Sequence, residues 1–288
     1  MVIDFRCRPP TDYFLQYFDP PRVAWMAARL GAPNLAPSFL KGSMQLFWEE
    51  MDKADIDIGV VLGRNSPAVF MGKPFKEAFI PNEHIAELQA KYPKRLVGFG
   101  GIDASNSKHD AVAETVRCVE KLGLKGIFVE PGRQLPSHAA DERLNPVYEA
   151  CISLKIPVVV MSGPYAGADI GASHPVAIDQ LATRYPELRI VLGHGAWPWI
   201  DETLGVAFKH PNVYVSPDIY LFAPGGARYV DAINGALQDQ FLFATAFPLR
   251  PLVQTVADCR AFPLRAETAA KFFAGNAKRL LGLQVDGH

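Results

Sequence analysis

The apolar residues of the chain fall in short runs that recur at an even spacing. Runs rich in Val, Ile, Leu or Phe predict eight β-strands, and the amphipathic segments between them predict helices. The predicted strands cover residues 2–8, 57–63, 95–102, 124–130, 156–162, 188–194, 212–216 and 241–246. The predicted helices cover residues 43–54, 82–92, 110–122, 144–154, 175–185, 199–209, 226–237 and 249–258, with two short helices near 266–273 and 276–282.

Helix-boundary signals support this division. Pro81 precedes one helix, Asn145-Pro146 opens another, and Gly123 follows a third. Strand and helix alternate eight times over 288 residues, with no low-complexity linker. The pattern predicts an α/β protein whose residues 1–288 form a single domain, a closed (β/α)8 TIM-type barrel. A doubly wound open sheet is the main alternative.

Two connections are much longer than the roughly 2–6 residues typical of such loops. They are residues 9–42 after the first strand and 64–81 after the second. Their aromatic residues either pack on the barrel's own surface or cover a small substrate and exclude water. Those of the first connection are Tyr13, Phe14, Tyr17, Phe18 and Trp25.

Composition excludes several classes of partner. A formal net charge of −1 gives no field that would gather nucleic acid or an anionic membrane. The longest apolar runs are far shorter than the roughly 20 residues that cross a bilayer. No charged-then-apolar secretory signal opens the chain, so we expect a cytoplasmic location.

The cysteines and glycines of the chain form no known cofactor-binding motif. The four cysteines are widely spaced, without a Cys-x-x-Cys pair, and we expect them to be free thiols. Gly98, Gly100 and Gly101 lack the spaced third glycine of a dinucleotide fingerprint, and no phosphate-binding loop motif occurs. The sequence therefore does not predict nucleotide binding.

Polar side chains gather where the predicted strands end, which is where barrels of this type build their active sites. The two-residue period of a strand places Asp4, Arg6 and Arg8 on one face, opposite Ile3, Phe5 and Cys7. The other polar or sulfur-bearing residues at strand ends are Arg64, Asn65, Asp103, Glu130, Met161, Ser162, His194, Ser216, Asp218 and Thr245.

The arginines suggest an anionic ligand. A guanidinium is a planar fork of donors that matches a carboxylate or phosphate and stays charged when buried. Arg6, Arg8 and Arg64 are the candidates. The alternative is a set of internal ion pairs, Arg6 with Asp4 and Arg8 with Glu130 or Asp218, although buried pairs are not an obvious source of stability.

His194 is the candidate acid or base, since its ordinary pKa near 6.5 suits either role. It lies between two glycines where an apolar strand gives way to a turn, although a lone histidine is more often structural. Asp218 or Glu130 would assist it. We expect the substrate to contact Asn65, Met161, Ser162 and Trp197 in addition to the arginines.

Four segments carry a resemblance to a known family. They are 82–100, 144–160, 177–195 and 276–283, which include the stretches Asn-Glu-His-Ile-Ala-Glu-Leu, Ile-Val-Leu-Gly-His-Gly and Asn-Ala-Lys-Arg-Leu-Leu-Gly-Leu. Together they resemble the amidohydrolase superfamily, in its amidohydrolase-2 branch of decarboxylases and pyrone dicarboxylate hydrolases. The resemblance implies a distorted barrel, an active site at its mouth and, commonly, a homodimer.

The chain departs from the metal-dependent members of that family. Where the resemblance implies a first-strand His-x-His pair, this sequence has Arg6 and Arg8, and Met161 and Ala246 replace a further histidine and an aspartate. Only His194 is left. One imidazole is too few for a catalytic metal, and two guanidiniums would repel a divalent ion. We therefore expect no divalent metal and no other cofactor.

Three functions remain open. The sequence favours a metal-independent hydrolase of a small carboxylate-bearing ester, lactone or amide, in which Arg6, Arg8 and Arg64 bind the anion and His194 activates water. A carboxy-lyase (decarboxylase) is the first alternative, disfavoured because a cation against the departing carboxylate would stabilise it. A non-catalytic anion-binding pseudoenzyme is the second.

Overall fold

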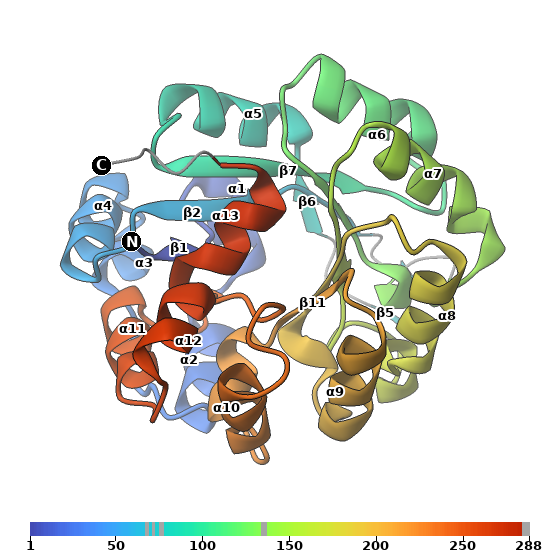
Figure 1. Ribbon diagram of the computed structural model, residues 1–288. Helices are drawn as coiled ribbons and strands as arrows, with labels where there is room; N and C mark the ends of the chain where they lie inside the picture. Colours follow the sequence, from blue (N-terminus) through green and yellow to red (C-terminus); the bar gives the residue numbers. More distant parts are fainter. Residues whose placement is uncertain (67–68, 71–72, 75–77, 134–136, 284–288) are drawn as a thin grey trace.

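The computed structural model describes residues 1–66, 69–70, 73–74, 78–133 and 137–283. Its strands curl into a barrel inside a ring of helices (Figure 1). Seven parallel strands pair in the order β1-β2-β7-β8-β9-β10-β11. This arrangement confirms the predicted α/β TIM-barrel fold. The strands are β1 (Ile3–Asp4), β2 (Ile58–Leu62), β7 (Leu96–Ile102), β8 (Ile127–Val129), β9 (Val158–Met161), β10 (Ile190–Gly193) and β11 (Val213–Ser216).

The eighth position of the barrel is closed by an extended segment, so the regular strand predicted at 241–246 is wrong. Phe241 makes a single bridge to Val215, whose carbonyl also accepts from the Leu242 N–H at 2.9 Å. On the other side, the Phe5 N–H donates to the Phe243 carbonyl at 2.9 Å. The segment therefore lies between β11 and the first strand without a continuous ladder.

Side chains replace the missing ladder at this seam. The Asp4 carboxylate accepts from the backbone of Arg6 at 3.0 Å, and from the backbone and hydroxyl of Thr245 at 2.9 and 2.6 Å. Regular pairing therefore stops at Asp4 and the predicted strand 2–8 is too long. The two-residue alternation ends with it: Phe5 lies in the core inside the barrel, whereas Cys7 lies in the core between strands and helices.

The outer helices agree with the sequence prediction to within a few residues. Ser43 and Asp110 cap two of them, accepting from the N–H groups of Leu46 and Ala113. All four cysteines are buried free thiols, as predicted. The outer helices are α4 (Met44–Lys53), α5 (Asn82–Lys91), α6 (Ala111–Glu120), α7 (Asn145–Ser153), α8 (Val176–Arg184), α9 (Ile200–Lys209), α10 (Ala227–Asn234) and α11 (Leu252–Arg260), followed by α12 (Ala266–Ala270), a π-turn (Lys271–Gly275) and α13 (Asn276–Leu281).

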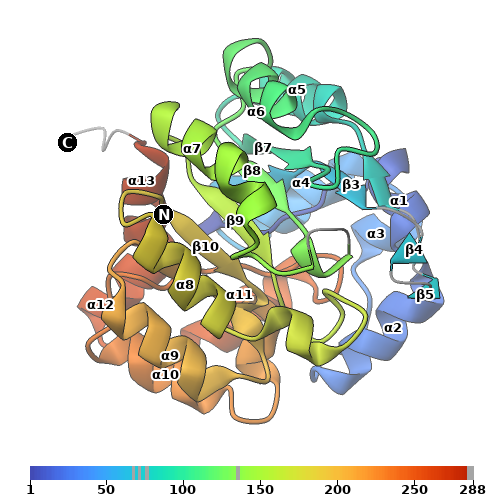
Figure 2. The ribbon, with the colours of Figure 1, turned by 90° about the vertical axis from the view of Figure 1, so that its right-hand side faces the viewer.

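The long connections carry structure of their own. We call α1 (Asp12–Tyr17) and α2 (Pro20–Arg29) the lid; α3 (Pro37–Lys41) follows them. The second connection contains β3 (Arg64–Ser66), paired antiparallel with β6 (Ala78–Ile80), and the short pair β4 (Val69–Phe70) and β5 (Lys73–Pro74). Figure 2 places α2, β4 and β5 on the opposite side of the molecule from α12 and α13.

No helix in the described part of the chain is long and apolar enough to span a membrane. The single-domain organisation, the cytoplasmic location and the homodimer stay predictions.

Candidate active site

A small cavity of about 40 Å³ lies where the lid meets the strand ends. Its wall includes Arg8, Met161 and His194, which belong to the barrel strands or follow them. The lid adds Tyr17, the last residue of α1, and Phe18, in the turn between α1 and α2. Tyr17 and Phe18 are at most 7% exposed, whereas Tyr13 is 38% and Trp25 51% exposed. Phe14, Tyr17 and Phe18 all pack in the core, and Tyr17 and Phe18 also line the cavity. That they cover a substrate stays a prediction.

His194 and Asp218 form a buried dyad. The Nδ1 atom of His194 lies 2.7 Å from an Asp218 carboxylate oxygen, which also accepts from the Ile219 N–H. The sequence left open which acid assists His194, and the structure pairs it with Asp218. Burial, together with the charge of Arg6, lowers the pKa of His194 to about 4. The imidazole is therefore neutral near pH 7, and because a carboxylate only accepts, we assign the proton to Nδ1 and the lone pair to Nε2.

The backbone is strained at three successive strand ends. His194, Asp218 and Ala246 have φ angles of 62°, 44° and 52°, in the left-handed region that non-glycine residues rarely adopt. Each such residue costs on the order of 1–3 kcal/mol, and such residues cluster at functional sites. The strain supports a functional role for this end of the barrel.

Arg64, which lines the cavity, forms a buried ion pair with Glu130. The Arg64 Nε donates to Glu130 at 2.8 Å, and its Nη2 makes a second contact with the same carboxylate. Arg133 adds a longer contact of 3.9 Å to Glu130. Glu130 therefore offsets the positive charge of these guanidiniums. The sequence analysis offered it instead as one of two acids that could assist His194. The face of Arg64 lies over the Tyr17 ring, 4.3 Å from its centroid.

Arg8 lines the cavity and also closes the barrel seam. Its Nη1 donates to the carbonyls of Ala246 and Phe247 at 2.8 and 2.9 Å, and its guanidinium lies 4.8 Å from the centroid of Phe18. Burial and the like charges of Arg6 and Arg64 lower the pKa of Arg8 to about 9. The charges of the neighbouring guanidiniums thus add to the effect of burial at this position.

Arg6 lies next to the cavity wall but is not part of it. Its Nη2 contacts the sulfur of Met161 at 3.0 Å, and its guanidinium lies 5.6 Å from the Phe128 centroid. The Nε of Arg6 is buried and has no hydrogen-bond partner among the described residues. A Cβ atom at Gly193 would come within 2.8 Å of the Arg6 Nη1, so the Arg6 guanidinium would have to move to make room for it. Arg6 therefore acts on the site through its charge.

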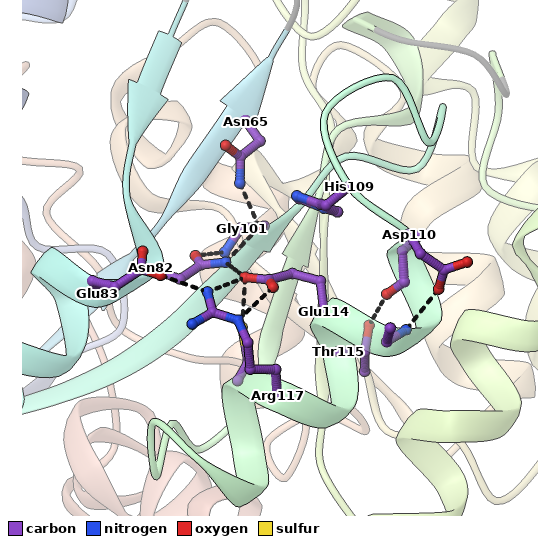
Figure 3. Close-up of polar contacts among 12 residues, drawn as sticks. Asn65, Asn82, Glu83, Gly101, His109, Asp110, Glu114, Thr115 and Arg117 are labelled. Atoms are coloured by element: carbon purple, nitrogen blue, oxygen red, sulfur yellow. Dashed lines mark hydrogen bonds and ion pairs between the residues drawn. The ribbon is translucent and has the colours of Figure 1, made fainter.

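Two of the predicted contact residues support the backbone. Asn65 donates to the Gly101 carbonyl at 2.7 Å, beside Asn82, which also binds Gly101 (Figure 3). Ser162 donates to the Gly193 carbonyl and accepts from the Ala196 N–H at 3.0 Å. The structure thus uses both polar groups to hold neighbouring loops together.

Trp197 lies farther out. Its indole donates to the Pro224 carbonyl at 3.0 Å and stacks on Tyr220, with ring centroids 5.3 Å apart. Together with Trp25 and Tyr165, these rings line an outer cavity of about 290 Å³. It shares Met26, Tyr165 and Tyr220 with the inner cavity.

The sequence analysis missed Arg133, Arg22 and Tyr220, which line the inner cavity. Arg133 follows Glu130 by three residues in the loop after the fourth strand, and this spacing could have indicated it. Arg22 belongs to the lid, and no sequence signal places it over the barrel.

The donor set does not fit a divalent metal. Within residues 1–66, 69–70, 73–74, 78–133 and 137–283, no three or more His, Cys, Asp or Glu residues gather closely enough to hold one. His194 and Asp218 bind each other, and the charges of Arg6 and Arg8 bear on the same imidazole. A catalytic metal site needs about three protein ligands, so we derive no chemistry through a metal.

Comparison with known proteins identifies the family. A family model described as Amidohydrolase (Amidohydro_2) matches residues 49–283. The chain belongs to the amidohydrolase-2 family. A 2-amino-3-carboxymuconate-6-semialdehyde decarboxylase from Dictyostelium discoideum is 30% identical over 129 residues, which are 42% of this chain and 34% of that protein. The match thus spans about a third of the length of this curated relative.

Solved structures of similar shape support the barrel. An uncharacterized TIM-barrel protein, Bb4693 from Bordetella bronchiseptica, is 37% identical with a TM-score of 0.90, covering 98% of both chains. A 5-carboxyvanillate decarboxylase from Novosphingobium aromaticivorans, solved with bound manganese, is 19% identical with a TM-score of 0.64, covering 98% of this chain and 97% of that one. At this identity the second likeness shows the fold alone.

Proposed function

We propose that this amidohydrolase-2 protein binds a small carboxylic acid in the inner cavity and removes a carboxylate as CO2 without a divalent metal. The observation that carries the proposal is the buried cluster of guanidiniums beside a neutral histidine. Among the described residues at the cavity, Arg64 and Arg133 contact Glu130, whereas Arg8 donates to backbone carbonyls. Arg6 adds charge to the His194–Asp218 dyad.

This excess of buried positive charge supports an anionic substrate. Like charges buried together are unfavourable, and they are the reason, after burial itself, that the pKa of Arg8 is lowered. An incoming carboxylate would relieve this repulsion and would accept paired, charge-assisted hydrogen bonds from a guanidinium. Because a cavity of about 40 Å³ holds only a few water molecules, we expect the lid to open for the substrate.

The relatives favour decarboxylation over the hydrolysis that the sequence suggested. The curated relative from Dictyostelium is named a decarboxylase. The objection that a cation stabilises the departing carboxylate does not hold if Arg8 and Arg64 bind a second carboxylate, one that stays on the substrate and takes up the electron pair. The departing carboxylate would then lie against the apolar side chains of Phe18, Val23 and Leu249, where desolvation assists its loss.

In this account His194 acts as an acceptor. Its Nε2 lone pair would bind a hydroxyl or amino group next to the carboxylate, and Asp218 would fix the ring orientation. Hydrolysis is the second candidate, because a neutral imidazole oriented by a buried carboxylate is also a suitable base for water. Against hydrolysis, Ala246 provides no carboxylate at the eighth strand position to hold that water.

Product analysis separates the two reactions. The protein is incubated with a panel of aromatic and muconic acids, and separately with lactones and esters that carry a carboxylate. We expect CO2 release from at least one acid, abolished in His194→Asn, and no hydrolysis of the esters. Hydrolysis without CO2 release would favour the second candidate, and no turnover of either set would contradict the proposed function.

A further inference from the structure

Loss of CO2 leaves an electron pair on carbon, and the reaction needs a group that supplies a proton there. His194 does not fit this role, because the imidazole is neutral and its remaining proton is assigned to the bond with Asp218. Three tyrosines, Tyr17, Tyr165 and Tyr220, line the inner cavity within the described residues. The inference below rests on the proposed decarboxylation.

Tyr17 differs from the other two in what surrounds it. It is the last residue of α1, is 5% exposed, and lies with its ring over the Arg64 guanidinium. Arg64 also hydrogen-bonds to the Tyr17 side chain. Since a guanidinium only donates, the phenolic oxygen is the acceptor in this contact. Arg22 of α2 approaches the same ring, 5.7 Å from its centroid.

We propose that Tyr17 is the general acid of the reaction and is carried into the cavity by the lid. The carbon–carbon bond breaks and CO2 leaves, while the bonding pair stays with the substrate. The Tyr17 O–H bond then breaks, a C–H bond forms, and a phenolate remains beside Arg64. This phenolate regains a proton from water when the lid opens, so each turnover takes up one solvent proton.

Several charged groups face Tyr17, and they ease this transfer. Burial and Glu130 raise the pKa of Tyr17, but Arg64, Arg133 and Arg22 more than offset them, and the net pKa lies below the usual value. An acid whose pKa lies closer to the working pH transfers its proton more effectively.

Tyr220 lies in the opposite environment. Burial and the charge of Asp218 raise the pKa of Tyr220, so it holds its proton. Tyr165 is 40% exposed and lies at the boundary with the outer cavity.

Replacing Tyr17 by Phe tests the role, because Phe keeps the ring over Arg64 and removes only the hydroxyl. Tyr13→Phe is the matched control: Tyr13 lies on the same helix, but it is 38% exposed and packs against His84 outside the cavity. On an acid that the wild type decarboxylates, we expect Tyr17→Phe to lower kcat by about 100-fold or more, with KM changed only a few-fold. Tyr13→Phe should keep wild-type kcat.

The pH profile separates an acid from a merely structural tyrosine. In the wild type, kcat/KM should fall at high pH as Tyr17 loses its proton, and this limb should be missing in Tyr17→Phe. A loosened lid would raise KM instead and leave the limb in place. Wild-type kcat in Tyr17→Phe, or an unchanged basic limb, would overturn the role of Tyr17 alone. Absence of CO2 release by the wild type would overturn the proposed function, and with it this role.

Discussion

At the scale of single residues, the protonation state of His194 depends on its burial and on the charges around it. Burial is the main cause of its lowered pKa, and Arg6 is the next. The folded protein therefore binds the His194 proton near pH 4, whereas an unfolded chain binds it near the ordinary value of about 6.5. Since the unfolded state then binds more protons, this residue makes the protein less stable as the pH falls from about 6.5 to 4.

Replacing Arg6 by Met should raise the pKa of His194. The substitution removes a positive charge that disfavours the imidazolium, while Asp218, which favours it, remains. The measurement is an NMR titration of the His194 ring protons in both proteins, with His138 as an internal reference. An unchanged or lower pKa of His194 in Arg6→Met would show that Arg6 does not act on the imidazole.

Residue types at the strand ends predicted part of this site. Arg8, Arg64, His194 and Met161 were found because their place at strand ends follows from the barrel pattern. Asn65 was predicted to touch substrate, but its amide binds the Gly101 carbonyl. A polar side chain at a strand end can face the ligand or the neighbouring backbone, and the sequence does not distinguish these two directions.

At the scale of elements, the Arg64–Glu130 pair joins β3 to the residue that follows β8. Both side chains are at most 6% exposed. Removing one partner of a buried pair costs about 3–5 kcal/mol. Here Arg133 would stay within 3.9 Å of Glu130 and offset part of that cost.

We therefore expect Arg64→Met to lower the free energy of unfolding by about 3 kcal/mol, the low end of this range. The double variant Arg64→Met/Glu130→Gln should recover part of this loss, because the glutamine carries no buried charge. Chemical denaturation of the three proteins measures the effect. A single variant as stable as the wild type would show that the pair does not hold these elements together.

The first and eighth strands show where element prediction fails. Their apolar runs are present, but Asp4 and Arg8 bind Thr245, Ala246 and Phe247 through their side chains and replace the backbone ladder. The hydrophobic pattern indicates which residues are buried. It does not indicate which groups form hydrogen bonds with the backbone N–H and C=O groups. The lid helices were also missed. The first has only six residues, too few for a clear periodic signal, and the second opens with two prolines, which are typical of loops as well as of helix starts.

At the scale of the whole molecule, the alternation of strands and helices was enough to predict the barrel, because eight such alternations are compatible with few architectures. The chemistry did not follow from the fold, since one barrel family hosts several reactions. The central claim is that guanidiniums at the strand ends hold a carboxylate where related enzymes are expected to use a metal.

Calorimetric titration of benzoate into chelator-treated protein tests this claim most directly. Arg8→Met is the test variant, and Arg143→Met is the matched control, because Arg143 lies outside the cavity and is 61% exposed. We expect wild type and Arg143→Met to bind benzoate equally without metal, and Arg8→Met to bind it about 10- to 100-fold more weakly, the loss of one hydrogen bond to a charged group. Binding that requires added manganese, or that is unchanged in a folded Arg8→Met protein, would contradict the account.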